Sequence, residues 1–85
     1  MYEIRFVNSK IQKRIDECIR LRGDVEDKLK RLSINPFKEI GAHPLRGRLK
    51  GKWSCWLGSN IRMIYSINVE KKLIIVQLVG NHKIY

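Results

Sequence analysis

Three side chains in the second half of the sequence have the chemistry that a catalytic site would need. His82 and Tyr85 stand in the closing segment VGNHKIY, and Arg62 lies in IRMIYSI. An imidazole titrates near neutral pH and is the commonest general acid or base. A phenol can donate a proton or stack on a base, and a guanidinium suits a phosphate. A lone histidine, however, is more often a surface residue than a catalyst, so these residues alone do not predict an enzyme.

A regular series of basic residues precedes these three, in the segment HPLRGRLKGKW. The basic residues occupy every second position: Arg46, Arg48, Lys50 and Lys52. In an extended chain this spacing places four cationic groups on one side, about 7 Å apart, close to the repeat of a single-stranded phosphate backbone. The series predicts a surface that binds nucleic acid and carries no information on sequence preference. A solvated charged loop is the alternative.

The distribution of charge favours the same interpretation. The chain of 85 residues has a formal net charge of +10 at pH 7. Residues 1–39 contain ten basic and seven acidic side chains, whereas residues 40–85 contain eight basic side chains and a single acid, Glu70. A concentrated positive excess is typical of a surface that binds polyanions, either nucleic acid or an acidic protein.

The two tryptophans are distinguished by the alternation of side chains along a strand. Trp53 and Trp56 are three residues apart, so they face opposite sides of a regular strand. Trp53 shares its side with Cys55 and Leu57 and is the expected core residue. Trp56 shares its side with Ser54 and can serve as a stacking platform for bases. Burial of both indoles under helices or loops is the alternative.

Apolar patterning predicts the helices and the first strand that support these groups. Residues 2–6 alternate between apolar and charged side chains and indicate a half-buried strand. Asn8 or Ser9 can cap a following helix that has one apolar face. Asp24 can cap a second helix. We expect the two helices to form a hairpin on a flat surface.

The remainder of the chain predicts a long loop and a sheet. From 33 to 52 periodicity is lost and glycine and proline recur, which indicates a loop of unusual length. Three strands are expected after it, at Trp53–Leu57, Ile61–Ile67 and Leu73–Val79. The order β-α-α-β-β-β predicts one α+β domain, residues 1–85, with an N-terminal strand and helical hairpin packed on a mostly antiparallel four-stranded sheet.

Composition excludes several other classes of protein. The hydrophobic content of 44% fits a globular chain, and no apolar run is long enough to span a membrane. The start MYEIRFVNSK lacks the pattern of a signal peptide, so we expect a cytoplasmic protein. Cys18 and Cys55 read as small buried hydrophobes. The histidines and cysteines fit no zinc spacing, and the second half has no carboxylate cluster for magnesium, so we expect no metal and no other cofactor.

Three segments, taken together, resemble motifs of a known family. HPLRGRLKG, IRMIYSI and VGNHKIY, in this order and in a chain of this size, are similar to motifs of the RelE/YoeB/YafQ superfamily of toxins from type II toxin–antitoxin systems. The resemblance covers the whole chain and implies a RelE/ParE-like fold. It also implies a metal-independent, ribosome-dependent endoribonuclease, an mRNA interferase that inhibits translation. Such an enzyme cuts messenger RNA in the decoding site by attack of the ribose 2′-hydroxyl on the adjacent phosphate.

The resemblance assigns roles to individual residues. Arg62 matches the arginine of the family's R-x-x-Y strand, which steadies the phosphate. His82 follows the glycine of the last strand, where RelE-like members have an arginine and YafQ-like members a histidine. Tyr85 matches the terminal aromatic that stacks on the scissile base or assists proton transfer, and His43 resembles the loop histidine of YafQ-like members. The residues expected to bind RNA are His43, Arg46, Arg48, Lys50, Lys52, Trp56 and Lys83.

The resemblance further implies two kinds of partner, and two alternatives stay open beside it. A RelB-like antitoxin would cover the basic surface in a tight heterocomplex, and the ribosome with its messenger RNA would be the target. The first alternative is a ParE-like toxin that binds DNA gyrase without cleaving nucleic acid. Such toxins generally lack the arginine–histidine pair that Arg62 and His82 form here. The second alternative is a non-catalytic basic module that binds RNA or the ribosome.

Overall fold

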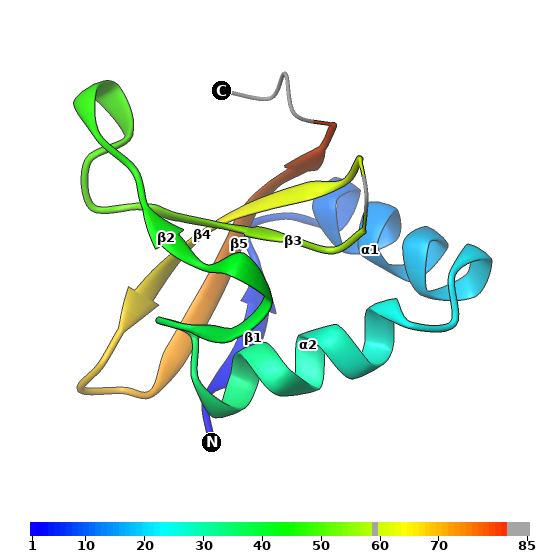
Figure 1. Cartoon of the computed structure of the whole chain (residues 1–85), viewed down its shortest axis with the longest axis horizontal. Coiled ribbons are helices and arrows are strands. Elements are labelled where there is room, and N and C mark those ends of the chain that lie inside the picture. Colours follow the sequence, from blue (N-terminus) through cyan, green and yellow to red (C-terminus); the bar gives the residue numbers. More distant parts are fainter. Residues whose placement is uncertain (59, 82–85) are drawn as a thin grey trace.

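Two α-helices cover one face of a twisted sheet, and no α-helix of the described residues lies on the other face (Figure 1). The computed structural model describes residues 1–58 and 60–81 of the chain. The elements are, in order, β1 (Glu3–Phe6), α1 (Ser9–Leu21), α2 (Val25–Ile34), the 3-10 turn η1 (Glu39–Gly41), β2 (His43–Pro44), the 3-10 turn η2 (Gly47–Leu49), β3 (Trp53–Trp56), β4 (Arg62–Asn68) and β5 (Leu73–Gly80). Within the described ranges, no helix is long and apolar enough to cross a membrane.

The sheet has five strands in the order β1-β5-β4-β3-β2. The first strand pairs parallel with β5, and the other neighbouring strands are antiparallel. The α+β class and the order of the helices and longer strands are therefore confirmed, but the predicted count of four strands is one too low. The additional strand, β2, has two residues, one of them a proline. A segment this short cannot show the alternation by which strands are predicted.

The two helices begin in different ways. The Asn8 side chain caps α1, because its Oδ1 accepts a hydrogen bond of 2.9 Å from the backbone N–H of Ile11. Asp24 precedes α2 but its side chain caps nothing, so the predicted cap is wrong. The physical reason is that Asp24 has helical backbone angles, φ −87° and ψ −11°, rather than the extended ones of a capping residue. Its carboxylate instead lies 3.1 Å from Lys28 Nζ, one helical turn away.

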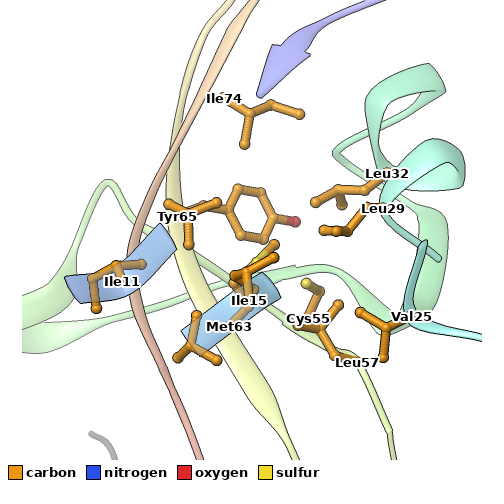
Figure 2. Packing of buried hydrophobic residues seen from close by; sticks show 12 residues of the cluster. Ile11, Ile15, Val25, Leu29, Leu32, Cys55, Leu57, Met63, Tyr65 and Ile74 are labelled. Atoms are coloured by element: carbon orange, nitrogen blue, oxygen red, sulfur yellow. The ribbon is translucent and has the colours of Figure 1, made fainter. Parts of the chain in front are cut away.

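The core lies between the helices and the covered face of the sheet, with Tyr65 in its middle (Figure 2). The helices contribute aliphatic residues such as Ile15 and Leu32, which are almost completely buried. Burying each such side chain stabilises the fold by roughly 1.5–3 kcal/mol. Cys18 and Cys55 are free thiols; Cys55 is buried, as expected, whereas Cys18 is only partly buried. Burial raises the pKa of the Cys55 thiol to about 12, so this residue stays neutral and serves as packing.

A buried hydrogen bond ties the segment between α2 and β2 to the sheet. The Tyr65 hydroxyl donates to the Pro36 carbonyl at 2.8 Å, and both residues are fully buried. Next to this bond, Phe37 packs edge-on against Trp53, with ring centroids 5.2 Å apart. The segment that leads from α2 to β2 is therefore anchored on β4 and β3. This anchoring fixes the loop residues that reach the helix-free face.

Candidate active site on the helix-free face

Three sequence segments meet at one end of the sheet. In the strand register, Trp56 of β3 lies opposite Arg62 of β4, and Arg62 lies opposite Gly80 of β5. Arg62 is therefore flanked by β3 on one side and by the last residue of β5, which precedes the C-terminal tail, on the other. The structure thus brings together residues that the sequence places in separate motifs. We call the side of the sheet on which Trp56 and Arg62 lie the helix-free face.

Trp56 and Arg62 are in direct contact. The guanidinium carbon of Arg62 lies 3.8 Å from the centre of the Trp56 ring, which is a close cation–π arrangement. Both side chains are partly buried. Trp53 and Cys55, in contrast, pack with the core, as the alternation along the strand predicts. One ring face of the expected stacking platform is therefore occupied by Arg62.

A left-handed turn supports the Trp56 ring from the neighbouring loop. Ile40 and Gly41 have positive φ values of 49° and 71°. A Cβ atom at Gly41 would lie 2.8 Å from Cδ1 of Trp56, closer than such atoms approach in proteins. Position 41 therefore requires glycine for two reasons, the backbone angle and the contact with the indole. Ile40 is β-branched, for which a positive φ is a strained conformation.

His43 lies on β2, the edge strand next to the strand that carries Trp56. It pairs with Ser54 across the β2–β3 ladder, and its Nδ1 lies 3.0 Å from the carbonyl oxygen of Gly41. A carbonyl oxygen only accepts, so Nδ1 carries the proton in this contact. In the neutral ring, Nε2 then has the free lone pair and can accept a hydrogen bond or a proton. The Gly41 backbone thus contacts both His43 and Trp56.

The basic loop folds differently from the extended form that its spacing suggests. Residues 47–49 form the turn η2, and positive φ values at Gly47 and Gly51, 68° and 92°, bend the chain. The Leu45 N–H donates to the Lys52 carbonyl at 2.9 Å, which closes the loop. The expectation of four cationic groups on one side of a straight strand is therefore wrong. Gly47 and Gly51 make the turns that bend the loop.

The four basic residues nevertheless belong to one projecting loop. They lie on the green loop at the upper left of Figure 1, which extends from the sheet away from the helices. Arg46, Arg48 and Lys50 are exposed, and Lys52 is partly buried. None of these four side chains forms an ion pair with another residue in the described part of the chain. We call residues 46–52 the basic loop.

A groove of about 360 Å³ borders the end of β5 on the helical side. Its lining is largely apolar and includes Cys18, Leu21, Ile61 and Val79. At its edge, Arg14 of α1 donates a hydrogen bond of 2.8 Å from Nη1 to the Val79 carbonyl. This bond ties the last residues of β5 to α1. The point from which the C-terminal tail departs is therefore fixed on both sides, by Arg14 and by the pairing of Gly80 with Arg62.

The other expected site residues of the tail, His82, Lys83 and Tyr85, lie outside the described residues. The described chain ends at Asn81, next to the residue that pairs with Arg62. The assigned roles of His82 and Tyr85 thus remain predictions. Residue types alone did not point to Ile40 and Gly41 as part of the site. Gly41 was visible only as one of several loop glycines, and nothing in the sequence links it to Trp56.

The fold is one that solved structures of small α+β toxins share. Solved structures with this fold include a YoeB/ParE toxin from Agrobacterium tumefaciens, with a TM-score of 0.75 and 20% identity over 96% of this chain and 99% of that one. A chain of the RelBE2 toxin–antitoxin complex from Mycobacterium tuberculosis matches with a TM-score of 0.72 and 24% identity, over 95% of this chain and 98% of that one. YafQ from E. coli matches with a TM-score of 0.65 and 19% identity over 96% of this chain and 94% of that one.

These likenesses establish the fold. No protein-family model matches the chain, and no curated protein matches it in sequence. The structural neighbours include toxins of each of the three types that the sequence motifs resemble: RelE, YoeB and YafQ. The RelE/YoeB/YafQ-type fold expected from the sequence is therefore confirmed.

Proposed function

We propose that this chain is the toxin of a toxin–antitoxin pair and acts as a ribosome-dependent endoribonuclease. Its substrate is messenger RNA in the decoding site of the ribosome, and its effect is to inhibit translation in the cytoplasm. The observation that carries this proposal is the position of Arg62. Its guanidinium is stacked on Trp56 at 3.8 Å and lies on the strand next to the start of the tail that bears His82. The fold shared with RelE/YoeB/YafQ-type toxins supports the same conclusion.

The proposed reaction is an internal transfer at one phosphate. The ribose 2′-oxygen loses its proton and bonds to the adjacent phosphorus, and the bond from phosphorus to the 5′-oxygen breaks. The products are a 2′,3′-cyclic phosphate and a 5′-hydroxyl that has gained a proton. Arg62 stabilises the charge that builds up on the phosphate oxygens. His82 moves a proton at one end of the reaction, and Tyr85 stacks on the scissile base or assists that transfer.

The remaining expected residues hold the RNA. The basic loop supplies cations for the phosphate backbone of messenger or ribosomal RNA. His43 lies at the same edge of the sheet as Trp56 and has an unprotonated ring nitrogen available in its neutral form. The exposed parts of Trp56 can contact a base, and Lys83 in the tail adds a further charge. No metal is needed in this scheme, because the chain's own side chains supply the cation and the proton transfers.

A cognate RelB-like antitoxin is the proposed protein partner. One of the structural neighbours is a toxin–antitoxin complex, RelBE2. The net charge of +10 favours an acidic partner segment that neutralises the basic half. Such a segment would compete with RNA for the same cations.

The test is to map cleavage of a translated message on programmed ribosomes. Wild type is compared with Arg62→Ala and His82→Ala, and the 5′ ends of the fragments are identified. We expect decoding-site cuts with 5′-hydroxyl ends, and a loss in rate of about 100-fold or more in each variant. Arg20→Ala removes an exposed arginine from the last turn of α1, outside the proposed site, and should cut like wild type.

Two results would reject the proposal. If the folded wild-type protein leaves the message intact, the chain is a gyrase-binding toxin of the ParE type or a non-catalytic RNA-binding module. A DNA gyrase supercoiling assay separates these two classes. If Arg62→Ala and His82→Ala cut as fast as Arg20→Ala, the chain is a nuclease whose catalytic residues lie elsewhere.

A further inference from the structure

We propose that Trp56 and the left-handed turn at Ile40 and Gly41 are positioning residues for Arg62. The turn holds the indole, and the indole holds the guanidinium in the plane that a phosphate requires. The catalytic meaning of this arrangement rests on the function proposed above. The arrangement itself rests on three contacts in the described part of the chain.

The first contact is the stack of Arg62 on Trp56. An arginine side chain has many rotamers, and fixing it on binding costs conformational entropy. Stacking at 3.8 Å removes much of that freedom before any ligand arrives. The N–H donors of a guanidinium point outward in its own plane, so a ring stacked on its face does not itself occupy them. Trp56 therefore orients the cation without consuming its donors.

The second contact is that of Gly41 with Trp56. The Cα of Gly41 lies so close to the indole that a Cβ atom would be 2.8 Å from Cδ1 and 3.6 Å from Nε1. This approach limits the tilt of the ring on the side of the loop. Gly41 can lie there only because its φ is +71°, a value that other residues rarely adopt. The turn and the ring thus fit each other closely.

The third contact anchors the turn. Ile40 keeps a strained positive φ of 49° and packs against the core. Upstream, the buried hydrogen bond from the Tyr65 hydroxyl to the Pro36 carbonyl fixes the same loop on β4. Arg62 and Tyr65 belong to one strand, so the loop is anchored on the strand whose arginine it positions. Backbone strain that is retained in this way is common where geometry serves function.

The structural part of the proposal is tested by NMR, independently of any catalytic activity. The ring current of Trp56 should shift the Arg62 Nε–Hε resonance away from those of the other arginines. We expect Trp56→Leu and Gly41→Ala to move this resonance towards the position of a solvent-exposed arginine, and Trp56→Phe to retain part of the shift. Gly47→Ala is the matched control, because Gly47 also has a positive φ, 68°, but no atom lies within 4 Å of its would-be Cβ.

The catalytic part is tested by the rate of message cleavage. Trp56→Leu should lower the rate at saturating ribosomes about 10- to 100-fold and change the half-saturating ribosome concentration less than about threefold. Trp56→Phe should restore most of the rate, because it restores a ring under the guanidinium. Circular dichroism and thermal unfolding identify any variant that fails to fold.

The outcomes separate this proposal from the one on which it rests. If wild type does not cleave RNA, the nuclease assignment fails, and the NMR series still decides whether Trp56 and Gly41 fix Arg62. If the Arg62 resonance in Trp56→Leu or Gly41→Ala stays at the wild-type position, the positioning proposal is wrong even for an active nuclease. It is also wrong if the resonance moves but Trp56→Leu cuts as fast as wild type.

Discussion

The two halves of this chain differ in how their charges are paired: residues 1–39, with both α-helices, form the helical half, and residues 40–85, with most of the sheet, form the sheet half. In the described part of the chain, every ion pair joins residues between 3 and 39. Lys28 Nζ lies 3.1 Å from Asp24, and Arg31 Nε lies 2.8 Å from Glu39. The basic loop, in contrast, forms no ion pair with any described residue, and residues 40–85 contain one acid, Glu70.

Under the proposed function, this difference points to the surface for a polyanion. Exposed ion pairs add little stability, so the acids of the helical half do not serve mainly to hold the fold together. Their effect is to offset ten basic side chains and lower the positive potential around the helices. The sheet half keeps its potential. The helix-free face and the basic loop are therefore the surface at which RNA or an acidic partner is expected.

The largest expected effect comes from removing the unpaired charges. In this variant, glutamine replaces the four basic residues of the basic loop: Arg46, Arg48, Lys50 and Lys52. Affinity for a single-stranded RNA oligonucleotide should fall about 100-fold at low salt. The slope of log affinity against log salt should decrease in magnitude by about 3, because each lost phosphate contact contributes roughly 0.7. Fluorescence anisotropy over a salt series measures both quantities.

The matched control removes the same number of charges from the paired half. Glutamine replaces four basic residues that form ion pairs: Arg22, Lys28, Lys30 and Arg31. The net charge of the two variants is then identical. Affinity and salt slope should stay close to wild type, with a slope change of less than about 1. Equal losses in both variants would mean that total charge, rather than its position, governs binding.

An intermediate effect is expected at the bond that joins the two regions. Tyr65→Phe removes the hydroxyl that donates to the buried Pro36 carbonyl. An unsatisfied buried carbonyl should lower the free energy of unfolding by about 1–3 kcal/mol, measured by urea denaturation. Tyr2→Phe, at a partly exposed ring that packs against Phe37, should change it far less. If the two variants are equally stable, the loop is not held by this bond.

The smallest effect concerns the pairing of Asp24 with Lys28. The hydrogen bond from Lys28 lowers the pKa of the Asp24 carboxyl below its ordinary value of 3.8. The carboxylate therefore favours the folded state above about pH 4, and this contribution is lost as pH falls through the folded-state pKa. In Lys28→Met, an NMR titration should show the pKa of Asp24 rising towards its ordinary value. An unchanged pKa would show that the pair does not persist in solution.

Much of the fold could be predicted from local patterns. The alternating residues 2–6 include β1, which begins one residue later than predicted, and the apolar spacing of the helices matches their buried faces. The predicted strand at Leu73–Val79 differs from β5 by one residue. The loop from 33 to 52 was recognised as irregular, but its turns depend on backbone angles that residue spacing does not reveal. The predicted cap at Asp24 failed because this residue has helical rather than extended backbone angles, and its carboxylate lies against Lys28 instead.

The sequence by itself determined the chemistry that is available: a basic second half, an arginine in a strand, and a histidine and a tyrosine in the closing segment. Local periodicity also determined the class of the fold, because burial of apolar residues imposes a pattern on helices and strands. Only the tertiary structure decided that Arg62 lies against Trp56 and beside Gly80, and that Gly41 supports the ring. These contacts arise from strand register and from a left-handed turn, and both depend on how distant segments pack rather than on neighbouring residues.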